Sequence, residues 1–453
     1  MDNNTTPSST MADEIFEILW QWRIEFLSVS FIAIVYWACA RRVGYTWSAV
    51  IVALAVTALG CLPSIRRLLA RTLRLTHWRR QLVRALGSQS SPLAKRQPKV
   101  IKALRVPSGV RLTLSLQSGT ALHELERLCP YLATHFGARE VRVTADRTNA
   151  SRAELTICTK DPFEDGPIPW PGVTGEATSA WDPISIGVDR DGNNISISLI
   201  ERNLLIGGEP GSGKSVMLNV LIAYLARCSD VKLYLFDAKF VELRTWSQVA
   251  AGFVGPNIDD AIAQLQRLRS MMEERYRFLG QQRARKLERH HGLDSIVVVI
   301  DELPFYTANP ERNKAKEFND LLGDLVARGR AAGIIFVAAA QKPSADTLPS
   351  FIRDLINLRL AFRCSTKEAS DTILGGGWAS AGFSATTIGI NNRGVGWLLG
   401  ESGQPELIRG YFIDDATIAQ IIEENGSRFS PDELAHTTNA CNACSGPSRE
   451  SSN

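Results

Sequence analysis

The stretch Asn203-Leu-Leu-Ile-Gly-Gly208-Glu-Pro-Gly-Ser-Gly-Lys-Ser215 decides the fold of this 453-residue chain. Its last eight residues match the pattern Gly-x-x-x-x-Gly-Lys-Ser at every fixed position. An apolar strand pattern precedes them, and a helical pattern over 216–226 follows. Glycines let the backbone wrap around phosphates, while the loop amides and the helix N-terminus supply positive potential. We therefore predict a nucleotide-binding loop made of Gly208, Glu209, Pro210, Gly211, Ser212, Gly213, Lys214 and Ser215.

A second motif supplies two adjacent acids. The run Ser-Ile-Val-Val-Val-Ile at 295–300 is typical of a buried strand, and it ends at Asp301-Glu302. We assign Lys214 to the β- and γ-phosphates of ATP, and Ser215 and Asp301 to Mg²⁺. Glu302 is then placed to orient and deprotonate an attacking water. The pair favours ATP hydrolysis over phosphoryl transfer to a small acceptor, and two solvated acids at a strand end are the alternative.

Two further polar residues are candidates for the same chemistry. Gln341 follows the apolar run 333–340 and is predicted to sense the γ-phosphate. A strand-end amide without a functional role is the alternative. Arg330 lies in Ala327-Arg-Gly-Arg-Ala-Ala-Gly333, just before that run. An arginine donated across a subunit boundary stabilises transition-state charge, so we predict this role for Arg330, with a surface arginine as the alternative.

The segment 184–425 alternates apolar strand patterns with helical patterns. The predicted strands are 184–188, 195–199, 203–206, 231–236, 295–300, 333–339 and 358–362. This alternation predicts a mainly parallel sheet covered by helices on both faces. The fold class is therefore α/β, with a P-loop ATPase domain over 184–425, and the family resemblance described below implies that this domain is a RecA-like motor.

The segments around the motor domain have different compositions. Residues 103–160 predict a small α/β accessory domain, with strands at 110–116, 141–145 and 153–158 and a helix at 120–136. Residues 161–183, rich in Pro, Gly and Trp, are predicted to be a connector. The polar residues 426–453 are predicted to form a disordered tail.

The N-terminal part of the chain is strongly asymmetric in charge. The whole chain has a net charge of +4, yet residues 41–105 hold fourteen Lys or Arg and no acid. Residues 1–24 form a short N-terminal segment. One uncharged run, 26–40, precedes the basic block, and a second, 43–65, lies within it between two pairs of arginines. We predict a transmembrane hairpin over 25–66, with a single span over 43–65 or a buried core hairpin as alternatives. Residues 67–102 are then a basic linker, which places the motor domain in the cytoplasm at the cell membrane.

Several motifs in order give the chain a family resemblance. Besides the loop at 208–215 and the acids at 301–302, these are Phe236-Asp-Ala-Lys-Phe-Val-Glu-Leu-Arg-Thr-Trp246, Met272-Glu-Glu-Arg-Tyr276, Arg330-Ala-Ala-Gly333, Gln341-Lys-Pro-Ser344 and Pro405-Glu-Leu-Ile-Arg-Gly410. Over roughly 180–425 the chain resembles the FtsK/SpoIIIE family of DNA translocases, and most closely its Tra-type conjugation proteins of actinobacterial plasmids and integrative elements. One departure is Asp237-Ala-Lys-Phe240, where the family more usually has Asp-Pro-Lys-Gly.

The resemblance implies a function that the motifs alone do not give. It implies a membrane-anchored motor that assembles as a ring, usually a hexamer, and that moves double-stranded DNA by hydrolysing ATP with Mg²⁺. The expected role is conjugative transfer of a plasmid or integrative element. The alternatives are a protein-translocating secretion ATPase and a chromosome-segregation or division-site ATPase of the same superfamily.

Overall fold

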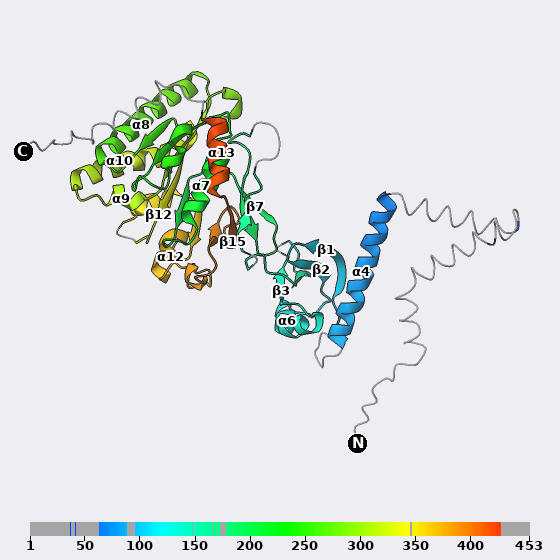
Figure 1. The fold of residues 1–453 in the computed structure, drawn as a ribbon. Coiled ribbons are helices and arrows are strands. Elements are labelled where there is room, and N and C mark those ends of the chain that lie inside the picture. Colours follow the sequence, from blue (N-terminus) through cyan, green and yellow to red (C-terminus); the bar gives the residue numbers. More distant parts are fainter. Residues whose placement is uncertain are drawn as a thin grey trace, which may run out of the picture. The chain divides into compact units, whose positions relative to one another are not determined.

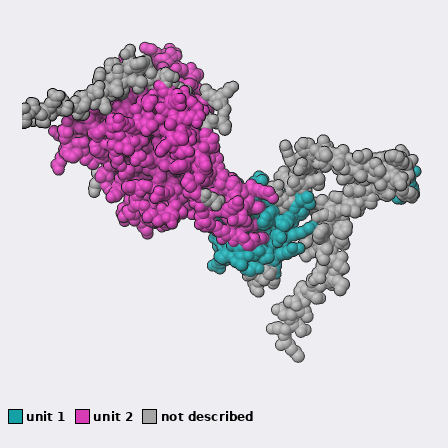
Figure 2. Space-filling view, in the orientation of Figure 1, with its two compact units in different colours: residues 1–104, 111–135, 141–156 teal, residues 105–110, 136–140, 157–453 magenta. Residues whose placement is uncertain are grey.

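The computed structural model describes Trp37, Arg41 and residues 63–87, 96–146, 148–164, 166–172, 178–344 and 347–426. These residues form two compact units (Figure 2). The small unit comprises residues up to 104 together with 111–135 and 141–156, and the large unit comprises 105–110, 136–140 and the residues from 157 onward. Nearly all of the transmembrane hairpin predicted over 25–66, and the tail after 426, lie outside the described residues.

The small unit holds most of a four-stranded sheet with two helices (Figure 1). The strand order is β1-β2-β4-β3. The elements are α4 (Pro63–Gly87), β1 (Lys99–Val106), β2 (Gly109–Ser115), α6 (Leu122–Phe136), β3 (Glu140–Ala145) and β4 (Arg152–Cys158). Leu112 and Leu114, two residues apart on one face of β2, are buried, and so are Leu125 and Leu132 of α6.

One prediction for this part of the chain was wrong. Residues 67–102 were expected to be a linker, but α4 continues to Gly87 and β1 begins at Lys99. The reason is the spacing of Leu82, Ala85 and Leu86, which are at most 1% exposed and give the basic helix one apolar face. The side chain of Arg79 also donates from Nε to the carbonyl of Val100, 3.0 Å away. Of the helices in the described part of the chain, none is long and apolar enough to cross a bilayer.

The large unit is built on one mixed sheet. The described strands form an eleven-stranded sheet in the order β10-β9-β11-β12-β8-β13-β14-β15-β6-β7, with β5 paired to β15. The strands are β5 (Ile168–Pro169), β6 (Ile184–Asp189), β7 (Asn194–Ile197), β8 (Leu204–Gly207), β9 (Val231–Phe236), β10 (Gly252–Val254), β11 (Ser295–Ile300), β12 (Ile334–Ala340), β13 (Leu358–Phe362), β14 (Val395–Leu399) and β15 (Glu406–Phe412). Pairing is parallel from β10 to β13 and antiparallel from β13 to β7.

Helices cover both faces of this sheet, since every residue of β11 and β12 is buried. The helices are α7 (Lys214–Leu225), η1 (Arg244–Val249), α8 (Ile258–Gln281), η2 (Arg289–His291), α9 (Leu303–Thr307), α10 (Arg312–Arg328), η3 (Gly329–Ala332), α11 (Ser350–Leu355), α12 (Lys367–Leu374), η4 (Ala385–Thr387) and α13 (Asp415–Asn425). One group, α8, α9, α10 and η3, packs together, and α13 packs with α7 and η1 (Figure 1).

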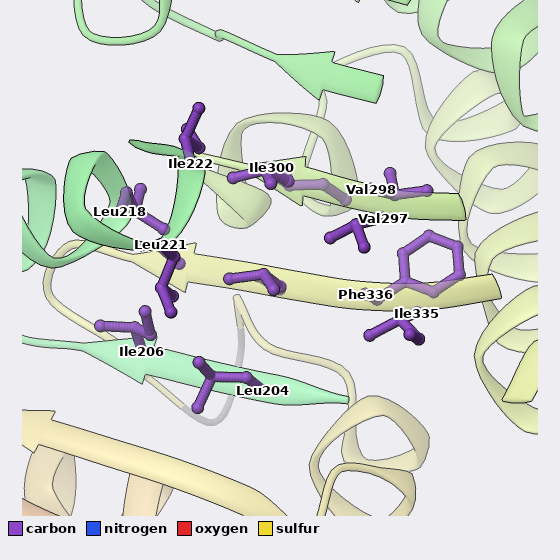
Figure 3. Close-up of a cluster of buried hydrophobic side chains, with 14 of the residues drawn as sticks. Leu204, Ile206, Leu218, Leu221, Ile222, Val297, Val298, Ile300, Ile335 and Phe336 are labelled. Carbon is purple, nitrogen blue, oxygen red and sulfur yellow. The ribbon is translucent and has the colours of Figure 1, made fainter. Parts of the chain in front are cut away.

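The core lies between α7 and the central strands. Figure 3 shows Leu218, Leu221 and Ile222 of α7 beside apolar side chains of β8, β11 and β12. Each such side chain contributes about 1.5–3 kcal/mol when fully buried. These strands are unbroken apolar runs because parallel strands are covered on both sides. The core therefore fixes the strand ends that carry the polar motifs.

Two parts of the large unit differ from the prediction. The segment 161–183, expected to be a connector, contributes Phe163 and Ala180 to the core and contains β5. The antiparallel strands β14 and β15 were not predicted, because glycines interrupt their apolar pattern at Gly396 and Gly410. Gly410 has little room for a side chain, since a Cβ there would lie 2.7 Å from Cε of Met217 in α7.

Candidate nucleotide-binding site

The candidate site lies at the carboxyl ends of three neighbouring parallel strands. The loop from Gly208 follows β8, the acids Asp301 and Glu302 follow β11, and Gln341 follows β12. In the sheet, β12 lies between β11 and β8, so the three strand ends are neighbours. Ligands of open α/β sheets bind outside the carboxyl ends of the strands. The structure therefore brings together the loop, both acids and Gln341, which come from three separate stretches of the sequence.

The phosphate-binding loop is held from two sides through its backbone. The Gly394 amide donates to the carbonyl of Ser212 over 2.8 Å, and the Gly208 amide donates to the carbonyl of Ala340 over 3.3 Å. Gly213 has a φ of 120°, and a Cβ at this position would lie 2.7 Å from the Cα of Gly394. Only glycine fits both the dihedral angle and the close approach of the neighbouring backbone.

Glu209 anchors the same loop through its side chain. Its carboxylate Oε2 lies 2.7 Å from Nη1 of Arg363, and its amide donates to the carbonyl of Arg363 over 2.9 Å. Arg363 directly follows β13, the strand beside β8. Glu209 therefore ties the start of the loop to the sheet, a role that the loop pattern did not predict because its x positions carry no residue requirement.

Lys214 and Asp301 form a buried ion pair. Lys214 Nζ lies 2.7 Å from Asp301 Oδ1 and 2.9 Å from the Asp301 carbonyl oxygen. The lysine is 3% exposed and the aspartate is fully buried. A charge at such depth requires a partner, because desolvation disfavours it strongly. If Lys214 binds the phosphates as predicted, it has to exchange Asp301 for phosphate oxygens, and nucleotide binding would change the environment of both residues.

The same residues fit a magnesium ion. Asp301 Oδ2 is buried and has no hydrogen-bond partner among the described residues, so one carboxylate oxygen is available as a ligand. Ser215, at the start of α7, supplies a hydroxyl of the kind that coordinates Mg²⁺ beside a bound nucleotide. Among the described residues, no three His, Cys, Asp or Glu side chains gather as a metal cage. That composition suits Mg²⁺, which binds through one or two protein groups together with phosphates and waters.

Glu302 is tied to Gln341 through the main chain. The Gln341 amide lies 3.0 Å from Glu302 Oε1 and 3.3 Å from Oε2. Burial raises the pKa of Glu302, while the Gln341 amide, Lys214 and Lys239 act in the opposite direction. A raised pKa makes the carboxylate a stronger base, as general-base catalysis requires. The sequence motif pointed to the Gln341 side chain, whereas the contact that the structure records for Gln341 is made by its backbone amide.

We expect ATP turnover to fall at acidic pH because Glu302 works as a base only when ionised. Since burial raises its pKa in the free protein, the acidic limb of kcat/KM should be centred above the ordinary glutamate value of about 4.3. The measurement is kcat/KM against pH, with circular dichroism at each pH to show that the chain stays folded. An acidic limb centred at or below the ordinary value would contradict the shift.

We expect loss of Lys214 to destabilise the fold as well as nucleotide binding. Lys214→Met leaves the buried Asp301 carboxylate without its cation, which costs about 3–5 kcal/mol of unfolding free energy. The double variant Lys214→Met/Asp301→Leu removes both charges and regains most of that stability, but it still fails to bind ATP. Urea unfolding without nucleotide measures the first effect and calorimetric titration the second. Lys367→Met, at an exposed position in α12, is the matched control.

Arg330 lies at the opposite end of the strand that leads to Gln341. It belongs to η3, directly before β12, and its side chain is exposed. The seven residues of β12 span about 20 Å. Arg330 therefore cannot reach the nucleotide loop of its own chain. Among the described residues, none forms an ion pair or hydrogen bond with its guanidinium.

Asp237 has a structural role that the sequence motif did not reveal. Its carboxylate is fully buried and accepts hydrogen bonds from the amides of Lys239, at 3.1 Å, and Leu243, at 2.9 Å. It thereby closes the loop after β9. Phe240, in this loop, has a φ of 58°, a left-handed conformation that usually favours glycine. That conformation explains physically why a glycine is the more usual residue at this position.

Comparisons with known proteins agree with this geometry. Residues 175–373 match the model of the FtsK/SpoIIIE family. The chain is similar to DNA translocase SftA of Bacillus subtilis, with 29% identity over 267 residues, covering 55% of this chain and 27% of that protein. It is also similar to DNA translocase FtsK of Clostridium acetobutylicum, with 28% identity over 343 residues, covering 72% of this chain and 43% of that protein. The chain thus spans less than half the length of these two relatives.

The fold has a match among solved structures. The pCW3 conjugation coupling protein TcpA, in a monomer form with ATPgS, superposes with a TM-score of 0.50 and 18% identity. The match covers 78% of this chain and 99% of that one. At this level of identity the likeness shows the α/β P-loop ATPase fold.

Proposed function

Starting from the FtsK/SpoIIIE family domain that residues 175–373 form, we propose that this chain is an ATP-driven translocase of double-stranded DNA. The observation that carries the proposal is a pair of contacts at the carboxyl ends of the central strands, Lys214 to Asp301 and Glu302 to Gln341. They bring together the groups that we assign to the phosphates, the metal ion and the general base, in a domain whose curated relatives are named DNA translocases.

The proposed chemistry is hydrolysis of the γ-phosphate of ATP. Lys214 leaves Asp301 to neutralise the β- and γ-phosphates, and Ser215 and Asp301 hold the magnesium ion. Bound Mg²⁺ supplies further neutralisation of the charge that develops on the phosphates. Glu302 orients the attacking water and accepts its proton, and the Gln341 amide holds the carboxylate in place. The products are ADP and inorganic phosphate.

We further propose that the chain acts as a ring, usually a hexamer, in which Arg330 completes the site of a neighbouring subunit. The support is its position about 20 Å from the loop of its own chain and its exposed side chain. An arginine supplied by a neighbour stabilises the transition-state charge and makes hydrolysis depend on assembly.

The biological role that we propose is conjugative transfer from the cell membrane. The support is the uncharged run 43–65 followed by a block of arginines, together with the fold that the chain shares with a conjugation coupling protein. A membrane anchor holds the motor at the envelope while the DNA moves past it. Contacts to the DNA are expected to be mainly to phosphates, which makes binding depend on salt.

The deciding experiment measures ATP turnover of the full chain in lipid nanodiscs, with and without random-sequence duplex DNA. We expect duplex DNA to stimulate turnover, and we expect the stimulation to weaken as salt rises. Glu302→Gln provides the background rate. Displacement of a triplex-forming strand then reports movement along the duplex. Turnover that is indifferent to duplex DNA in an assembled ring would exclude a DNA translocase, and stimulation by secreted polypeptides would indicate a protein-moving ATPase instead.

A further inference from the structure

Donors from outside the turn that carries Arg330 hold three backbone carbonyls in and next to this turn. The carbonyl of Arg328 accepts the Tyr276 hydroxyl at 2.6 Å, and the carbonyl of Ala331 accepts the Leu287 amide at 2.8 Å. The carbonyl of Ala332 accepts Nη1 of Arg275 at 2.7 Å. Carbonyls at the end of a helical turn lack partners within the turn, so such external donors fix its conformation.

Arg275 is the central donor of this arrangement. It projects from α8, and its guanidinium donates to the carbonyls of Ala332, Gly333 at 3.4 Å and Asp294 at 2.6 Å. Burial lowers the pKa of Arg275, but an arginine stays protonated in proteins. The planar fork thus connects the turn after α10 to the segment that leads into β11. A lysine has no such fork and cannot reproduce this set of bonds.

Tyr276 and its neighbours also restrain Arg328, the other arginine of the turn. The guanidinium of Arg328 lies 5.4 Å from the centre of the Tyr276 ring and pairs with Glu273 at 2.6 Å and Asp324 at 3.0 Å. Arg330 stands two residues away with an exposed side chain. The contacts of α8 therefore fix the backbone and one arginine while leaving the second arginine available to another molecule.

We propose that Arg275 and Tyr276 are positioning residues that present Arg330 to the nucleotide of the neighbouring subunit. This inference rests on the proposed function, because it assumes that Arg330 acts across a subunit boundary. It gives a physical role to Met272-Glu-Glu-Arg-Tyr276, which carries no group that could reach the nucleotide loop of its own chain, since α8 bonds to the turn before β12. Arg275 and Tyr276 act through Arg330 and touch no reacting atom.

The test uses conservative variants in the full chain. Tyr276→Phe removes one hydroxyl and keeps the ring, and it should lower kcat by about fivefold, the value of one net hydrogen bond. Arg275→Lys should lower kcat by at least tenfold, about 1.4 kcal/mol in the barrier. Neither variant should change the KM for ATP, because each retains an intact nucleotide loop. The matched controls are Tyr224→Phe, which loses a hydroxyl bond to the carbonyl of Ser179, and Arg277→Lys, at an exposed position of α8.

A double variant separates positioning from general destabilisation. If Tyr276 acts only through Arg330, Arg330→Ala/Tyr276→Phe should be no slower than Arg330→Ala alone. Mixed rings give a second readout, because a Tyr276→Phe subunit keeps a competent pocket and a Glu302→Gln subunit keeps a well-placed Arg330. Mixing them should therefore give turnover above the sum of the two separate rings.

The outcomes distinguish this inference from the proposed function. If Arg330→Ala itself leaves turnover unchanged, the trans role of Arg330 is wrong, and the positioning role is wrong with it. If Arg330→Ala removes turnover while Tyr276→Phe and Arg275→Lys behave like their controls, the positioning inference alone is overturned. A double variant slower than Arg330→Ala, or the absence of any gain on mixing, would also overturn it, because Tyr276 would then act elsewhere.

Discussion

Replacing Glu302 by glutamine should produce a protein that binds ATP and hardly hydrolyses it. Glu302→Gln keeps the shape of the side chain and removes the group that we propose as the base for the attacking water. We expect kcat to fall by about a thousandfold, within the range of losses seen for a general base. ATP affinity should change little, because Lys214 and the loop backbone, which hold the phosphates, are untouched.

The stability of this variant provides its control. Burial disfavours the charged form of Glu302, so a neutral amide of the same size should leave the melting temperature unchanged or slightly raised. ATP binding is measured by calorimetric titration, hydrolysis by phosphate release and folding by thermal melts. A variant that is stable and binds ATP but turns over at the wild-type rate would remove Glu302 from the catalytic role.

Arg330→Ala should abolish turnover only where subunits meet. In the assembled ring we expect kcat to fall by about a thousandfold or more, as for other arginines supplied in trans. The residual rate of dilute, dissociated subunits should be the same for the variant and the wild type. Arg328→Ala is a useful comparison, because Arg328 is already paired with Glu273 and Asp324.

Mixed assemblies identify the direction of the contact. Arg330→Ala subunits keep an intact pocket, and Glu302→Gln subunits keep an intact Arg330. Where the second type of subunit faces the pocket of the first, a complete site forms, so turnover should pass through a maximum as the mixing ratio varies. A rate that never exceeds that of the two separate proteins would place the action of Arg330 within its own subunit, against the geometry of β12.

The sequence predicts the central strands closely. Buried parallel strands are continuous apolar runs, and the ends of β9, β11 and β13 agree with the prediction to the residue. Because the ends of β9 and β11 are sharply marked, the acids that follow them, Asp237, Asp301 and Glu302, could also be located. The antiparallel part of the sheet was harder to predict, because β14 and β15 contain glycines that interrupt the apolar pattern.

What the sequence could not give is how these residues contact one another. A motif names Lys214 and Asp301, but only the order of the strands shows that the two form a buried pair. The backbone amide of Gln341 leaves no sequence signature, because every residue except proline has one. The basic helix α4 was missed for a different reason: its arginines suggested a linker and outweighed the short apolar spacing near its end.

If Arg330 completes the site of a neighbouring subunit, as we propose, strand β12 connects two catalytic sites that belong to different subunits. The carboxyl end of β12 leads to Gln341, whose backbone amide donates to Glu302 of the same chain. The other end begins just after the turn that carries the exposed Arg330. A fully hydrogen-bonded, buried strand behaves as a stiff rod, because close packing on both sides leaves it no room to buckle. Under that proposal, a displacement of Gln341 along the strand when phosphate departs would be passed on to the turn that carries Arg330. Hydrolysis at one site would then control when hydrolysis occurs at the next. The ring would need no other coupling between neighbouring subunits.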